Sequence, residues 1–174
     1  METAELVVTI RLKILRLLMK KFCPGFTLIE LLVTMSIIGI LFGIGVAQYN
    51  KFNRRQILDQ AAQTLKNNLR LAQNKASAGE KPASGCATLD GYQVNFIDSN
   101  PDYYTIGAKC SPSSPAANGF SLPTGVSFSS LPFPNPIIFK VLGQGTNVNV
   151  STNIVLSGFG DTRTITVSAT GEIK

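Results

Sequence analysis

The distribution of apolar residues separates an N-terminal stretch from a more polar remainder. Between Phe26 and Ala47 the only charged residue is Glu30, and this segment reads FTLIELLVTMSIIGILFGIGVA. A helix over this range would be about 33 Å long, which is enough to cross the hydrocarbon core of a bilayer. The pattern therefore predicts a membrane-spanning helix over residues 26–47.

The helical pattern continues beyond this stretch with a different character. Apolar residues recur at spacings of three and four, and polar or charged residues fill the positions between them. Ser77, Gly79 and Pro82 then predict the end of the helix. We expect residues 48–78 to form an amphipathic helix that packs on a core. Its apolar stripe consists of Leu58, Ala61, Ala62, Leu65, Leu69, Ala72 and Ala76.

Beyond Pro82 the sequence changes to short runs rich in Val, Ile, Thr and Phe, which are typical of β-strands. The segment 111–136 is rich in proline and is expected to be loop with one strand. The expected strands are Tyr92–Ile97, Tyr103–Ala108, Val126–Ser129, Ile137–Leu142, Asn153–Leu156 and Thr164–Ala169. The last is expected to pair with Glu172–Lys174 across Thr170-Gly171. The sequence thus predicts an α+β fold in which a long N-terminal helix packs on an antiparallel β-sheet, with residues 79–174 forming a β-rich globular head.

Charge and composition argue against catalysis. The chain contains no histidine, which removes histidine-based triads and the commonest metal ligand. No phosphate-binding or dinucleotide-binding glycine motif is present, so we expect neither an enzyme nor a cofactor. The segment Asp98–Asp102 resembles the start of a calcium loop, but Tyr103 stands where such a loop needs glycine. We therefore expect a solvated turn there, with no metal.

The residues around the start of the apolar helix carry the strongest signal. Lys20-Lys21-Phe22-Cys23-Pro24-Gly25 is followed directly by Phe26-Thr27-Leu28-Ile29-Glu30. This string resembles the N-terminal motif of type IV prepilins and pseudopilins. The resemblance implies that residues 1–25 are a leader, that a prepilin peptidase cuts between Gly25 and Phe26, and that the same enzyme N-methylates Phe26. Gly25 would allow the peptidase to approach the backbone, because glycine has no side chain.

Glu30 is unusual because it places a carboxylate one turn into a membrane helix. An isolated charge there would cost on the order of 3 kcal/mol or more, so Glu30 should have a partner. In the pilin family that partner is the N-terminal amine of a neighbouring subunit. The resemblance therefore implies that Glu30 pairs with the Phe26 amine of another subunit and sets the register of assembly. A plain signal anchor with Glu30 near the interface is the alternative.

Two features bear on the branch of the family. Many major pilins carry a proline within this helix, whereas here Gly39, Gly43 and Gly45 occupy the region. These glycines suit local melting or close helix packing. The segments Ile137–Gly143 and Arg163–Ile173 look like the ending of GspH/FimT-type minor pilins, the H-type pseudopilins of type II secretion and their fimbrial relatives. We expect a minor subunit, with a major pilin as the alternative.

The resemblance also implies a location and a set of partners. We expect a single-pass protein of the bacterial inner membrane with a cytoplasmic N-terminus, a periplasmic or extracellular head, and later incorporation into a pilus or pseudopilus. Lys20 and Lys21 favour this orientation. The implied partners are the peptidase, other pilin subunits, an inner-membrane assembly platform and membrane lipid. A signal-anchored binding or adhesion module remains the alternative, and translation from Met19 is as plausible as from Met1.

Removal of the leader would leave two of the three cysteines, Cys86 and Cys110. A disulfide between them would close a loop of about 25 residues and stabilise the head by roughly 3–4 kcal/mol. Two unpaired buried thiols are the alternative.

The formal net charge of +6 gives weak support for a nucleic-acid partner, because residues 1–25 hold five basic and two acidic residues and account for half of it. For a DNA-uptake minor pilin, Arg163 and Lys174 would be the contact residues. Dispersed surface charge is the simpler interpretation.

Overall fold

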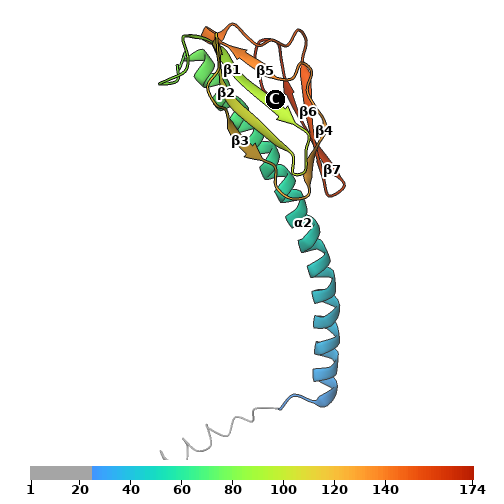
Figure 1. Ribbon diagram of the computed structural model, residues 1–174. Helices are drawn as coiled ribbons and strands as arrows, with labels where there is room; N and C mark the ends of the chain where they lie inside the picture. Colours follow the sequence, from blue (N-terminus) through green and yellow to red (C-terminus); the bar gives the residue numbers. More distant parts are fainter. Residues whose placement is uncertain (1–24) are drawn as a thin grey trace, which may run out of the picture. The chain divides into compact units, whose positions relative to one another are not determined.

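The computed structural model describes residues 25–174, which form two units that divide between Val46 and Ala47. Helix α2 (Leu28–Ser77) begins in the first unit and continues into the second, as Figure 1 shows. The predictions that concern Met1, Met19, Lys20, Lys21 and the rest of the leader before Gly25 lie outside the described residues.

In the first unit, α2 exposes almost every large apolar side chain. Examples are Leu28, Ile29, Met35, Ile40, Leu41 and Phe42. A helix that is apolar all round belongs in a hydrophobic medium, because in water it would expose far more apolar surface than a soluble protein tolerates. By length and composition α2 is the one helix among residues 25–174 that could cross a membrane.

In the second unit, α2 is amphipathic, and the predicted stripe is confirmed. Leu58, Leu65 and Leu69 are fully buried, Ala61, Ala72 and Ala76 are also buried, and Ala62 is half-buried. The helix ends as predicted at Ser77. The Gly79 N–H donates to the Ala76 carbonyl and the Glu80 N–H to the Lys75 carbonyl, both at 3.0 Å. This Schellman arrangement requires the left-handed φ of +62° that Gly79 adopts.

Seven strands in residues 88–167 form two antiparallel sheets. The four-stranded sheet has the order β3-β2-β1-β5, and the three-stranded sheet has the order β4-β6-β7. The first contains β1 (Thr88–Ile97), β2 (Tyr103–Ser111), β3 (Asn118–Ser121) and β5 (Ile137–Lys140). The second contains β4 (Val126–Ser130), β6 (Thr152–Gly158) and β7 (Asp161–Val167). The predicted α+β fold is confirmed.

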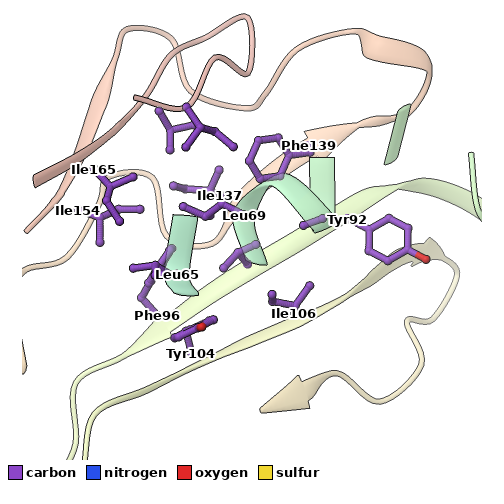
Figure 2. Packing of buried hydrophobic residues seen from close by; sticks show 14 of the residues in the cluster. Leu65, Leu69, Tyr92, Phe96, Tyr104, Ile106, Ile137, Phe139, Ile154 and Ile165 are labelled. Carbon is purple, nitrogen blue, oxygen red and sulfur yellow. The ribbon is translucent and has the colours of Figure 1, made fainter. Parts of the chain in front are cut away.

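One hydrophobic core joins the helix to both sheets. Figure 2 shows Leu65 and Leu69 of α2 among side chains from the sheets. The sheet residues labelled there are Tyr92, Phe96, Tyr104, Ile106, Ile137, Phe139, Ile154 and Ile165. Aromatic packing adds to this core, because the rings of Phe96 and Phe128 meet edge to face with centroids 5.6 Å apart. The amphipathic half of α2 therefore provides part of the interior of the head.

Polar contacts also fix the helix against the sheets. The Asn68 Nδ2 donates to the Tyr104 hydroxyl at 2.7 Å, and the Gln73 Nε2 donates to the Gly171 carbonyl at 3.0 Å. Arg55 forms a salt bridge with Asp161 at 2.9 Å. An exposed ion pair such as this one stabilises the fold by no more than about 1 kcal/mol. Its main effect is therefore to orient the helix.

The structure corrects the bounds of the expected strands. Strand β1 begins at Thr88, four residues earlier than expected, β2 ends at Ser111, and β6 spans Thr152–Gly158. The segment 111–136 contains two strands instead of one, because β3 pairs with the edge of β2. The strand expected over Ile137–Leu142 ends at Lys140, because Leu142 adopts a left-handed φ of +55° in a short 3-10 helix. The strand expected over Thr164–Ala169 begins at Asp161 and ends at Val167, and it pairs along its length with β6.

The expected hairpin with Glu172–Lys174 is present only as a single bridge between Val167 and Ile173 with nearby backbone hydrogen bonds.

Candidate functional site

The first turn of α2 is closed by a side chain of the motif itself. Thr27 precedes the first helical residue, and its Oγ1 accepts a hydrogen bond from the Glu30 N–H at 3.2 Å. This is half of a capping box, in which a threonine is followed three residues later by glutamate. The motif therefore determines where the helix begins and places Glu30 in its first turn.

The Glu30 carboxylate forms no salt bridge with residues 25–174 of its own chain, since the four ion pairs there involve other residues. A carboxylate at a helix N-terminus is stabilised by the helix dipole, but that contribution is usually below about 1 kcal/mol. This is less than the cost of burying a charge in a membrane. Glu30 is therefore free to form an ion pair with a cationic group of another molecule.

Other hydroxyl groups of the apolar helix bond within it. The Thr34 Oγ1 donates to the Leu31 carbonyl at 3.0 Å, and the Ser36 Oγ donates to the Leu32 carbonyl at 2.8 Å. These hydroxyls can enter a hydrocarbon environment because their donors are satisfied within the helix. The Glu30 carboxylate, in contrast, has no cationic partner among residues 25–174.

Gly25 and Phe26 lie before the helix in exposed backbone, and the Phe26 side chain is 79% exposed. A Cβ added at Gly25 would meet no atom within 4 Å. The same holds for Gly39, Gly43 and Gly45 within the helix. The folded chain therefore does not itself require glycine at these four positions, and a requirement would have to come from another molecule that approaches the backbone.

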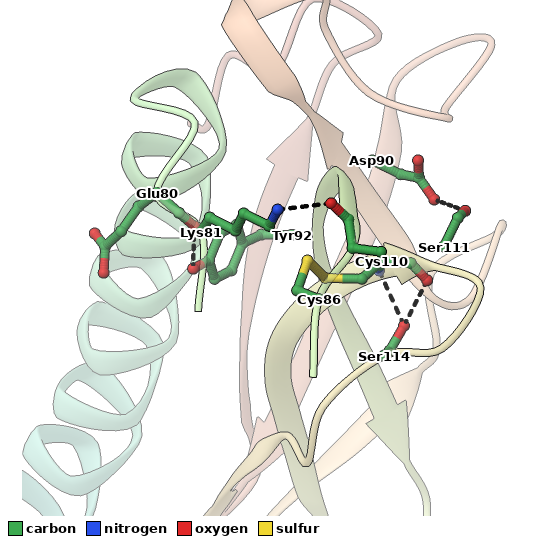
Figure 3. The surroundings of a disulfide bond; sticks show 9 residues. Glu80, Lys81, Cys86, Asp90, Tyr92, Cys110, Ser111 and Ser114 are labelled. Atoms are coloured by element: carbon green, nitrogen blue, oxygen red, sulfur yellow. Dashed lines mark hydrogen bonds between the residues drawn. A yellow bond between two sulfur atoms is a disulfide. The ribbon is translucent and has the colours of Figure 1, made fainter. Parts of the chain in front are cut away.

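The predicted disulfide between Cys86 and Cys110 is present, with Cα atoms 5.4 Å apart. Figure 3 shows that it joins the segment before β1 to the end of β2. The Lys81 Nζ donates to the Ala87 carbonyl at 2.6 Å, and the Ser114 Oγ accepts from the Cys110 N–H at 3.1 Å. The disulfide and these hydrogen bonds together connect the chain after α2 to the first sheet.

Arg163 and Lys174, the residues considered for DNA, both lie beside carboxylates. Arg163 of β7 donates to Asp59 of α2, and this hydrogen bond raises the pKa of its guanidinium further above its usual range. Lys174 lies 3.3 Å from a Glu172 oxygen. Each cation therefore already has a carboxylate partner.

The segment Asp98–Asp102 forms a turn that a buried carboxylate holds in place. The Asp102 side chain accepts the Ser99 N–H at 3.0 Å and the Phe128 N–H at 2.7 Å. Its oxygens thus bind backbone donors and tie the β1–β2 turn to β4. No cluster of three or more potential metal ligands occurs among the residues that the structure describes.

Analysis of the sequence missed the capping role of Thr27. The signal was present, because threonine followed three residues later by glutamate at the start of an apolar run is itself a helix-start pattern.

Residues 20–46 match the family described as the prokaryotic N-terminal methylation motif. No curated protein and no solved structure matches the chain. The match covers the charged stub, Gly25 and the exposed apolar start of α2, and it ends at the last residue of the first unit. By this motif and the fold that follows it, the chain has the features of a type IV pilin-like precursor, a prepilin or pseudopilin.

Proposed function

We propose that this chain is a structural subunit, a minor pilin or pseudopilin, of a type IV pilus or a type II secretion pseudopilus. A prepilin peptidase would cut it between Gly25 and Phe26 and methylate the new Phe26 amine. The observation that carries the proposal is the methylation motif at residues 20–46, which includes Gly25, Phe26 and the apolar start of α2.

The environment of Gly25 supports cleavage at this bond. Gly25 and Phe26 both lie outside the helix and are exposed, so a protease can reach the bond between them. Glycine is not needed there for the packing of the chain itself. Glycine at residue 25 would then serve the peptidase, because a side chain there would hinder its access to the backbone.

The environment of Glu30 supports a role in assembly. Its carboxylate lacks a cationic partner within residues 25–174, while cleavage would create a positive amine at Phe26. A pair between Glu30 and the Phe26 amine of a neighbouring subunit would satisfy both charges. Such a pair would fix the axial register of one helix against the next.

Assignment as a minor subunit rests on the C-terminal part of the head and on the apolar helix. The segments Ile137–Gly143 and Arg163–Ile173 look like the ending of GspH/FimT-type proteins, and the apolar helix contains glycines where many major pilins have a proline. The abundance of this chain in filaments would distinguish a minor subunit from a major pilin. In sheared filaments a minor subunit should form a small fraction of the total pilin by quantitative mass spectrometry.

Intact mass tests the processing step. The full chain would be expressed in cells with and without an active prepilin peptidase. We expect a product that begins at Phe26 and carries one added methyl group only when the peptidase is active. Gly25→Ala should block the cut, whereas Gly39→Ala, at a glycine that also has open space around it, should be processed normally.

Retention of the complete leader in the presence of an active peptidase would contradict the proposal. The chain would then be a signal-anchored binding or adhesion module.

A further inference from the structure

A cavity of about 510 Å³ opens between α2 and the turn that joins β6 to β7. Its volume lies in the range of small-ligand sites. All of its lining residues belong to the second unit. They are Asn50, Lys51, Arg54, Arg55, Phe159, Gly160 and Asp161.

The lining is strongly positive. Three cations face the cavity with a single carboxylate, Asp161, and this carboxylate is held by Arg55 at 2.9 Å. Lys51 and Arg54 form no salt bridge with any described residue. They lie three residues apart on one helix, so their side chains project from the same face. The cavity thus presents two unmatched positive charges to a ligand.

Phe159 completes the cavity in an unusual conformation. It has a left-handed φ of +57° at a hairpin turn, where glycine or asparagine is normally found, and its side chain is 42% exposed. The ring lies over Gly125, where an added Cβ would approach it to 2.6 Å. The Arg54 guanidinium lies 5.8 Å from the ring centroid. The turn therefore holds a phenyl ring that orients Arg54.

The cavity also lies close in sequence to the membrane segment. The apolar stretch ends at Ala47, and Lys51 follows four residues later. Even a fully extended chain covers at most about 14 Å over four residues, so Lys51 stays within reach of the headgroup layer. Tyr49 and Phe52 lie on either side of Lys51 in the sequence and are 68% and 59% exposed, as expected for aromatic residues at a membrane interface.

We infer that this cavity binds the phosphate of an anionic phospholipid in the leaflet next to the head, through Lys51 and Arg54. Arginine and lysine are the usual phosphate-binding side chains, and each adds to the attraction of a protein for an anionic membrane surface. The inference does not depend on processing, because the uncut chain carries the same residues.

Native mass spectrometry of the full-length chain in detergent tests the inference. Delipidated protein would be titrated with dioleoyl phosphatidylglycerol or with dioleoyl phosphatidylcholine. We expect at least about tenfold tighter binding of phosphatidylglycerol, since two cations contribute. The double variant Lys51→Gln/Arg54→Gln should lose most of this preference. The matched variant Lys66→Gln/Arg70→Gln removes the same charge farther along α2 and should keep it.

Three results would overturn the inference. Equal binding of the two lipids would show that no anionic headgroup site exists. Equal loss in both double variants would show a general effect of charge, without a role for the cavity. Loss of the phosphatidylglycerol preference in an excess of inorganic phosphate would identify a site for a free anion.

Discussion

The backbone N–H of Glu30 donates a hydrogen bond to the Oγ1 of Thr27 at 3.2 Å. The two residues of this hydrogen bond therefore have two structural roles in the first turn. Thr27 determines the first residue of α2, and Glu30 places a carboxylate at a defined height within that helix. Any role of Glu30 in register depends on a fixed helix start, and Thr27 provides it.

Removal of this cap should loosen the first turn of α2. A threonine cap is worth about 1 kcal/mol, so Thr27→Ala should speed hydrogen exchange of the amides of Glu30 and Leu31, which are bonded to Thr27, by about fivefold. Exchange would be measured by mass spectrometry on the full chain in detergent. Thr27→Ser keeps the hydroxyl and should exchange like the parent. An unchanged rate in Thr27→Ala would mean that the hydrogen bond does not hold the helix start.

Glu30→Gln should separate assembly from processing. The amide keeps the length of the side chain and leaves the Thr27 hydrogen bond intact, but it removes the charge that the Phe26 amine would require. We expect normal cleavage and methylation with incorporation into sheared filaments reduced on the order of tenfold or more. Incorporation would be measured by quantitative immunoblotting.

Ser36→Ala is the matched control for this experiment. Ser36 is a polar residue of the same apolar segment, and its hydroxyl bonds only to the Leu32 carbonyl. This variant should assemble normally. Normal incorporation of Glu30→Gln would show that assembly does not require the charge of Glu30. The proposal for the processing step would not be affected.

Reduction of the Cys86–Cys110 disulfide should destabilise the head. The bond joins cysteines 24 positions apart in the sequence. The chain-entropy model then gives roughly 3–4 kcal/mol of stabilisation. Cys86→Ser should lower the denaturation midpoint of the full chain in detergent, measured by circular dichroism. Cys23→Ser changes the same atom outside this loop and should not, and an equal shift in the two variants would argue against a specific effect of the bond.

Stability should fall at alkaline pH because of Tyr104. Burial raises the pKa of its hydroxyl, and the hydrogen bond from Asn68 opposes this effect only in part. The folded state therefore holds the phenol proton more tightly than the unfolded state. The associated stability is complete below the unfolded pKa of about 10 and is lost as the pH rises through the higher folded value.

Tyr104→Phe should flatten this decline when thermal unfolding is followed across the alkaline range. Part of the decline should remain, because burial also raises the pKa of Tyr92. Tyr103→Phe removes a hydroxyl at a more exposed neighbouring position and is the matched control. A slope in Tyr104→Phe identical to that of the parent would contradict the prediction.

The long helix and its buried stripe could be read from the sequence because both follow from periodicity. Leu65 and Leu69 repeat at helical spacing, and Gly79 lies where a left-handed residue is needed to end the helix. Strand β3 could not be read in this way. Its sequence Asn-Gly-Phe-Ser lacks alternation, and it forms because the edge of β2 offers unpaired backbone groups.

Other features of the head depend on tertiary packing that sequence patterns do not express. Leu142 is apolar and continues a strand-like run, yet it adopts a left-handed conformation and ends β5. Phe159 occupies a turn position that favours glycine because its ring packs over Gly125. The cavity beside Arg54 arises only when this turn meets α2, and the two lie about a hundred residues apart in the chain.

The contacts between α2 and the last hairpin also bear on the order in which the head folds. Arg55 reaches Asp161 across 106 positions, Asp59 reaches Arg163 across 104, and Gln73 reaches Gly171 across 98. Contacts so distant in sequence form slowly and late. The contacts of the helix with the last hairpin therefore form only after residues 161–171 have been translated. Until then the hydrophobic core is incomplete, because Ile165 and Val167 of the hairpin belong to it, and its apolar side chains are open to aggregation.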